Sequence, residues 1–212
     1  DEEDNANYSF FNQRTSLGNV ITRAESLKLG SEVGAYTPEV AADLLKAIPE
    51  AYTLLGKKEV TESELATKSK ELNDLMSILL PKLNLPTVST ATNETWYQLY
   101  TPNRDNRYLT SNGTGKGLTG NEKQAFARMM WKFVSRTDGT FDIINREDGS
   151  YINPVADYNA TISTTATAPA QGWELSYSNT AGLFIIRSSN VQLNQTQKNM
   201  SYALYNWSSG KD

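Results

Sequence analysis

Three short segments decide the fold: YQLYT at residues 97–101, FDIIN at residues 141–145 and FIIRS at residues 184–188. They begin 44 and then 43 residues apart, and each alternates apolar with other side chains, as a half-buried strand does. Each segment is followed by a polar turn and a second short strand, and then by a third strand that begins with an aromatic residue. The region from about Trp96 to Trp207 is therefore predicted to be a β domain that repeats three times.

One unit of this kind cannot bury its apolar face alone, so three units are expected to close on one another. Propeller blades have a similar period, but three blades are too few to close a ring, whereas a β-trefoil needs three units. The predicted core has three layers around a pseudo-threefold axis. Their members are Leu99, Ile143 and Ile186; Leu109, Ile152 and Leu193; and Trp131, Trp173 and Tyr202.

The tripeptide that ends in the aromatic residue of the third strand carries a family resemblance. Gln171-Gly172-Trp173 matches the Gln-x-Trp motif of ricin-type β-trefoils, while the other two repeats depart from it with Met129-Met130-Trp131 and Met200-Ser201-Tyr202. About residues 95–212 resemble this family, which implies a β-trefoil that binds carbohydrate. The family holds its sugar with an acid after the second strand. The corresponding residues here are Ser111, Pro154 and Gln195, and none is acidic.

The middle repeat keeps the most polar and aromatic side chains where such a lectin binds its sugar. The candidate ligand-binding residues are Asp148, Tyr151, Asn153 and Gln171. The Asp148-Gly149 pair is primarily a turn signal, so a purely structural role for these residues stays open. Tyr100 and Trp207 are further outward-facing aromatic candidates.

The first part of the chain is predicted to form three short amphipathic helices in a small bundle. Apolar residues recur at three- and four-residue intervals from Thr15 onward. A second helix is expected to begin at Thr37-Pro38-Glu39, and Pro49 either kinks or splits it. Thr61 and Glu64 have the spacing of a capping box at the start of the third helix.

The predicted end of the helical part lies in a proline-containing stretch. Pro81 and Pro86 stop the third helix, and the Thr/Ser/Asn-rich residues 87–95 form a linker. The pattern of Tyr36-Thr37, an alanine-rich middle and a Thr-x-x-Glu start resembles the helical spacer modules called FIVAR over about residues 15–80. The resemblance implies a spacer or interaction role for this part, without catalysis.

The composition excludes several classes of chemistry. The chain has neither cysteine nor histidine, which leaves no thiol nucleophile, no imidazole base and no zinc site of the usual kind. No cofactor and no metal ion is therefore expected. The net charge is −4 and the Lys and Arg residues are scattered, so no nucleic-acid partner is predicted. No apolar run approaches the roughly 18 residues of a membrane span.

The chain begins Asp-Glu-Glu-Asp-Asn, which is no signal peptide, although a mature exported protein looks like this after its signal is removed. The β part is rich in Thr, Ser, Asn and Tyr and poor in Lys and Glu, a surface typical of secreted bacterial proteins. We expect an extracellular, periplasmic or cell-surface location.

Together these patterns predict an α+β protein of two domains, a three-helix bundle with its linker over residues 1–92 and a β-trefoil over residues 93–212. The expected function is that of a lectin-like, carbohydrate-binding accessory module of a secreted or surface bacterial protein, with a glycan or polysaccharide as partner. A protein-interaction or structural module, packed on another protein domain, is the alternative. An enzyme would need paired carboxylates, which the β part offers mostly in turns and exposed strands, so catalysis is not expected.

Overall fold

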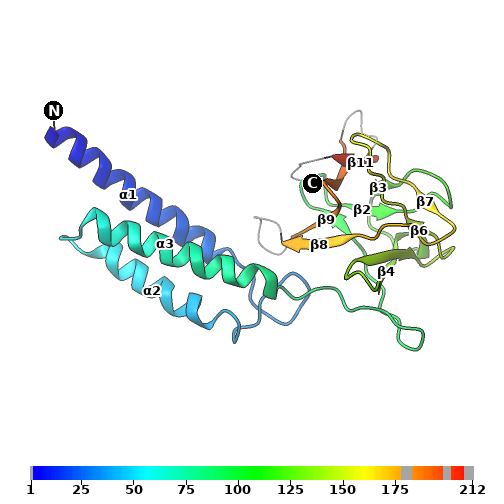
Figure 1. Ribbon diagram of the computed structural model, residues 1–212, viewed down its shortest axis with the longest axis horizontal. Coiled ribbons are helices and arrows are strands. Elements are labelled where there is room, and N and C mark those ends of the chain that lie inside the picture. Colours follow the sequence, from blue (N-terminus) through cyan, green and yellow to red (C-terminus); the bar gives the residue numbers. More distant parts are fainter. Residues whose placement is uncertain (1, 178–182, 198–201, 208–212) are drawn as a thin grey trace. The chain divides into compact units, whose positions relative to one another are not determined.

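The computed structural model describes residues 2–177, 183–197 and 202–207. The chain forms two compact units, one comprising Asp1–Leu85 and Tyr177–Phe184 and the other comprising Pro86–Ser176 and Ile185–Asp212. Three helices build the first unit and three small antiparallel sheets build the second (Figure 1).

The helical unit contains α1 (Glu2–Glu25), α2 (Ala42–Gly56) and α3 (Glu62–Leu79), followed by the 3₁₀ turn η1 (Leu80–Lys82). The predicted start of the first helix was wrong, because α1 begins long before Thr15. Tyr8 and Phe11 on its first turns are 69% and 66% exposed. The apolar stripe therefore marks the fully buried part of α1, and Phe10 before it also packs against the bundle core.

The start of α2 was also predicted too early. Residues 37–41 form a turn, in which the Ala41 amide donates to the Thr37 carbonyl at 3.2 Å, and the helix itself begins at Ala42. Ala41 is buried, whereas Val40 beside it is 37% exposed. Pro49 lies inside the continuous helix, so it does not split it.

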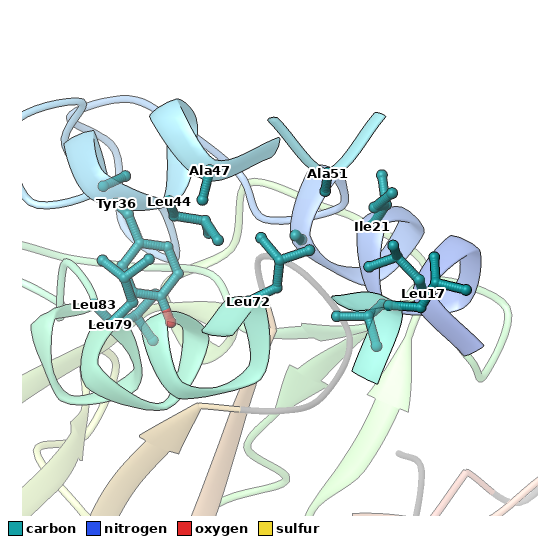
Figure 2. Packing of buried hydrophobic residues seen from close by; sticks show 13 residues of the cluster. Leu17, Ile21, Tyr36, Leu44, Ala47, Ala51, Leu72, Leu79 and Leu83 are labelled. Carbon is teal, nitrogen blue, oxygen red and sulfur yellow. The ribbon is translucent and has the colours of Figure 1, made fainter. Parts of the chain in front are cut away.

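The capping box of α3 is confirmed. The Glu64 amide donates to the Thr61 hydroxyl at 3.2 Å, and the Glu64 carboxylate accepts from the Thr61 amide at 2.7 Å. These reciprocal bonds satisfy two amides that a helix start leaves free, so they fix where α3 begins. The three helices then close over one apolar core (Figure 2). Its buried members include Leu17, Ile21, Tyr36, Leu44, Ala47, Ala51, Leu65, Leu72, Leu79 and Leu83.

The described residues contain eleven strands in three sheets, all in the second unit except Tyr177 at the end of β8 and Phe184 at the start of β9. The first sheet is β1 (Tyr100–Thr101), β2 (Arg107–Thr110) and β3 (Thr119–Asn121). The second is β4 (Trp131–Ser135), β5 (Phe141–Asn145), β6 (Tyr151–Ile152) and β7 (Thr164–Thr165). The third, in the order β11-β10-β9-β8, is β8 (Glu174–Tyr177), β9 (Phe184–Ser188), β10 (Val191–Gln195) and β11 (Leu204–Trp207). A short 3₁₀ turn, η2 (Ala127–Met129), precedes β4.

A ring of three backbone hydrogen bonds ties the sheets together. The Leu118 amide donates to the Ile162 carbonyl at 2.9 Å, the Ile162 amide to Leu204 at 2.9 Å, and the Leu204 amide back to Leu118 at 3.3 Å. All three side chains are buried in the same core. Because these residues stand 44 and 42 positions apart, one from each repeat, the ring lies on a pseudo-threefold axis. This closure makes the unit a β-trefoil.

The two tryptophans that were predicted to be equivalent are confirmed as such. The indole of Trp131 donates to the Leu109 carbonyl and that of Trp173 donates to the Ile152 carbonyl, each at 3.0 Å. Each tryptophan also exchanges two backbone hydrogen bonds of 2.8 Å, Trp131 with Tyr97 and Trp173 with Phe141.

The placing of Tyr202 as their third counterpart was wrong. Leu204 occupies the ring position of Leu118 and Ile162, and those residues precede their tryptophans by 13 and 11 positions. Tyr202 therefore stands before the ring residue of its repeat, far from the tryptophan position. Its phenol instead donates to the Asp105 carboxylate, and the Arg107 guanidinium lies 4.5 Å from its ring centre.

Candidate functional site

Asp148 lies in the turn between β5 and β6, as its pairing with Gly149 indicated. Gly149 has a φ of 70°, which favours glycine, and its amide donates to the Asn145 carbonyl. The Asp148 carboxylate accepts from the Ser150 amide at 3.0 Å and from the Thr114 hydroxyl at 2.8 Å. Burial alone would raise the pKa of Asp148, but the hydrogen bonds from Ser150 and Thr114 outweigh it and lower the pKa. Asp148 thus joins the first repeat to the second.

The other residues predicted for the middle repeat do not meet in one site. Tyr151 and Asn153 lie two positions apart on the same side of the chain at β6, and both are half-buried. Gln171 is exposed at the entry to Trp173. Among the residues that the structure describes, no hydrogen bond joins Gln171 to Asp148, Tyr151 or Asn153. Their role in ligand binding stays a prediction.

The central glycine of the Gln171-Gly172-Trp173 motif has a packing reason. A Cβ atom at Gly172 would overlap the Thr140 hydroxyl and the Arg136 side chain. Arg136 is held in this place by the Asp142 carboxylate at 2.8 Å and by the Pro169 carbonyl at 3.0 Å. The motif therefore packs closely against the turn that joins β4 to β5, and only a glycine at its centre leaves room for this contact.

The third repeat carries a different group of side chains on the outer face of its sheet, here called the third-repeat face. Its members are Arg187 on β9, Gln192 and Asn194 on β10, and Tyr205 and Trp207 on β11. Gln192 pairs directly with Trp207 on one side and with Arg187 on the other, and Asn194 pairs with Tyr205. Residues paired in this way point to the same face of an antiparallel sheet.

Two aromatic rings form the centre of the third-repeat face. The rings of Tyr205 and Trp207 stack with centroids 5.7 Å apart and an angle of 8° between their planes. The Trp207 indole donates to the Asn159 side-chain carbonyl at 2.8 Å, which fixes the orientation of the ring. Both rings are half-buried, so part of each remains open to solvent.

Amide groups flank this aromatic pair. Asn194 is only 1% exposed, its Nδ2 donates to the Gln192 carbonyl at 2.9 Å, and its Oδ1 has no hydrogen-bond partner. A buried acceptor without a partner is costly, and an ordered water that donates to it removes the cost. Gln195, at the position of the lectin acid, turns inward instead. It is 2% exposed and accepts from the Thr101 hydroxyl.

The first repeat holds a second aromatic pair, Tyr100 and Tyr108, with ring centroids 5.3 Å apart. Tyr100 is 50% exposed, as was expected of an outward aromatic. The Lys123 ammonium lies 5.6 Å from the centre of the Tyr108 ring. Because the Lys123 ammonium already lies near one of these two rings, the third-repeat face is the stronger candidate for a ligand-binding site.

Sequence reasoning selected Trp207 but missed its neighbours Asn159, Gln192, Asn194, Tyr205 and Arg187. The alternation of Tyr205 and Trp207 was the available signal. Among the described residues, no group of three or more Asp and Glu residues is placed to hold a metal ion. In that same part of the chain no helix has the length and apolar character needed to cross a bilayer.

The fold and this face define the class of module: a β-trefoil whose third repeat carries aromatic and amide side chains on the outer face of its sheet. No family model and no curated protein matches the chain. Solved structures with a similar fold include the designed threefold-symmetric protein ThreeFoil, with 14% identity and a TM-score of 0.49 over 54% of this chain and 90% of that one.

Two fungal proteins are similar to the same degree. The ricin B-like lectin of Macrolepiota procera, solved in complex with lactose, has 14% identity and a TM-score of 0.49 over 58% of this chain and 91% of its own. The Rhizoctonia solani agglutinin has 11% identity and a TM-score of 0.48 over 58% and 92%. The trefoil assignment rests on the hydrogen-bonded ring of Leu118, Ile162 and Leu204.

Proposed function

We propose that this chain is a non-catalytic, carbohydrate-binding module of a secreted or surface bacterial protein, and that it binds its glycan on the third-repeat face. The observation that carries the proposal is the half-exposed stack of Tyr205 and Trp207 with the amides of Gln192 and Asn194 opposite it. Aromatic rings with polar groups nearby suit a ligand that has both an apolar face and polar groups of its own.

A sugar ring has this double character. Its C–H face packs on an aromatic ring, while its hydroxyl groups exchange hydrogen bonds with side-chain amides, which both donate and accept. Gln192, which pairs with Trp207, supplies such an amide beside the ring. One open site of this size is expected to bind weakly, at about millimolar Kd or roughly −4 kcal/mol.

Several carboxylates that an enzyme would need have structural partners. Asp142 binds Arg136 and Asp105 binds Tyr202, while Glu174 lies 3.2 Å from Arg187. Hydrogen bonds from the Thr140 side chain and backbone lower the pKa of Asp138 in its turn. These partners support a module without catalysis. For the helical unit we propose the spacer role that a resemblance to FIVAR modules implies.

The test is a glycan-array screen of the intact chain, followed by NMR titration of the tryptophan indole N–H signals with each hit. A true ligand shifts the Trp207 signal, and Trp207→Ala abolishes binding. Tyr100→Ala is the matched control, because it removes an exposed, stacked aromatic from the first repeat. A glycan that binds equally well to the Trp207→Ala variant would refute the assignment of the site, and a screen without hits would refute the function.

A feature of the helical unit favours a second function, the binding of a protein partner. A cavity of about 320 Å³ opens between the helices and is lined mainly by apolar side chains. Leu29 and Leu45 on its wall are 41% and 38% exposed. If this cavity accepts an apolar side chain, an apolar fluorescent dye should bind there, and Leu45→Glu should abolish dye binding while the helical circular dichroism is unchanged.

A further inference from the structure

We propose that the third-repeat face prefers acidic sugars, those that carry a carboxylate such as uronic or sialic acids, over their neutral counterparts. This inference rests on the proposed function and names the ligand class for the same face. The inference follows from three side chains that form a row across adjacent strands. They are Trp207 on β11, Gln192 on β10 and Arg187 on β9.

The register of the sheet sets the spacing of this row. Gln192 pairs with Trp207 and with Arg187, so the three side chains point to one face from three adjacent strands. Neighbouring strands lie roughly 4.8 Å apart, which places the backbones of Trp207 and Arg187 roughly 10 Å apart. A pyranose packed on Trp207 covers Gln192, and a carboxylate at its edge comes within reach of the Arg187 side chain.

The Arg187 guanidinium is available for such a ligand. Its present ionic partner is Glu174 at 3.2 Å, and the two side chains are 43% and 51% exposed. Its Nη2 donates to the Ser189 carbonyl at a long 3.3 Å. An exposed ion pair of this kind contributes little, so a ligand carboxylate can replace Glu174 at small cost. Arginine suits this exchange because its fork binds a carboxylate through two parallel hydrogen bonds.

The other members of the face support the same ligand class. Gln192, Asn194 and Tyr205 of the face, and Asn159 beside Trp207, carry amide and phenol groups, none of which repels an anion. Glu174 is the one carboxylate that contacts Arg187 among the residues with described positions. Removing the charge of Glu174 should therefore raise the affinity for an acidic sugar. The inference can thus be tested by a gain of affinity.

The experiment titrates the intact chain with matched pairs of sugars and follows the Trp207 indole signal by NMR. The pairs are the methyl glycosides of glucose, galactose and mannose with the corresponding uronic acids, and the methyl glycoside of N-acetylneuraminic acid with its methyl ester. We expect the acidic member of at least one pair to bind about three to ten times more tightly at low salt, a preference that falls as sodium chloride rises.

Two variants locate the effect. Arg187→Gln should lower the affinity for the acidic sugar to that for its neutral counterpart, while Glu174→Gln should raise the affinity for the acidic sugar two- to threefold. If neutral and acidic sugars bind equally, or if Arg187→Gln keeps the preference, the inference is overturned and the proposed function stands. If no sugar of any pair shifts the Trp207 signal, the proposed function and the inference fail together.

Discussion

Shortening Leu204 to alanine removes three carbon atoms from the ring at which the three repeats meet. Leu204 is 3% exposed, and its backbone exchanges hydrogen bonds with Leu118 and Ile162. The substitution keeps those backbone bonds and removes only side-chain packing. Its effect therefore measures how much the third repeat contributes to closing the trefoil.

The expected loss follows from burial. Three buried carbons at about 0.8 kcal/mol each give roughly 2.4 kcal/mol. The cavity that remains adds a cost that grows by about 24 cal/mol for each Å³ left unfilled, so the total is expected between about 2.5 and 5 kcal/mol. Leu118→Ala and Ile162→Ala should fall in the same range, because both residues are fully buried in the same core.

Tyr202→Phe is the control. It distinguishes the observed alignment of the repeats, with Leu204 in the ring, from the predicted alignment, in which Tyr202 is the counterpart of the two tryptophans. It deletes the hydroxyl that binds Asp105 and keeps the ring. Asp105 is exposed and still accepts from Gln197 at 2.7 Å, so the loss should be near 1 kcal/mol.

The assay is urea unfolding followed by tryptophan fluorescence. All four tryptophans, at residues 96, 131, 173 and 207, belong to the trefoil unit, so their emission reports that unit alone. Circular dichroism at 222 nm follows the helices in the same samples. A loss below about 1 kcal/mol for Leu204→Ala, beside several kcal/mol for Leu118→Ala and Ile162→Ala, would refute the threefold ring.

Three further predictions concern single interactions. Thr61→Ala should lower the stability of the helical unit by about 1 kcal/mol in a 222 nm urea melt. The Thr61 backbone and side chain lower the pKa of Glu64, so this capping contribution should be present above pH of about 4.3 and lost as the pH falls through the folded-state pKa; a Thr61→Ala effect that is equal at pH 7 and pH 2.5 would contradict this. Gly172→Ala should destabilise the trefoil by about 1–3 kcal/mol through overpacking. An unchanged stability in the fluorescence melt would show that the hairpin containing Arg136 shifts to make room for the methyl group. Asp148→Ala should lower trefoil stability by about 1 kcal/mol and leave glycan binding unchanged, whereas weaker binding by NMR titration would place Asp148 in the site.

The repeat could be predicted from the sequence mainly because two of its segments are strands long enough to alternate, whereas of the predicted segment 97–101 only Tyr100–Thr101 forms a strand. Phe141–Asn145 and Phe184–Ser188 are strands with the predicted bounds. The strands beside Leu118 and Ile162 are only two or three residues long and are rich in Thr, so alternation could not reveal them. Tyr202 was then matched to the tryptophans by its aromatic character and its place in the order of strands.

The site was less predictable because it depends on which residues pair across strands. The outward alternation of Tyr205 and Trp207 is visible in the sequence. Their pairing with Asn194 and Gln192 is not, because it depends on the register between β10 and β11 and on the ring contact of Leu204. The Gln-x-Trp motif directed attention to the middle repeat, where its glycine serves the packing of a hairpin.

Threefold closure explains why one repeat can differ from the others on its outer surface. The ring residues point inward, so the positions one and three residues after them are free to vary without opening the core. These positions hold Thr119 and Asn121 in the first repeat, Ser163 and Thr165 in the second, and Tyr205 and Trp207 in the third. Only the third repeat combines aromatic side chains there with amides on the neighbouring strand. The trefoil should therefore bind one glycan on this set of positions, and a strong attachment would require several copies to act together.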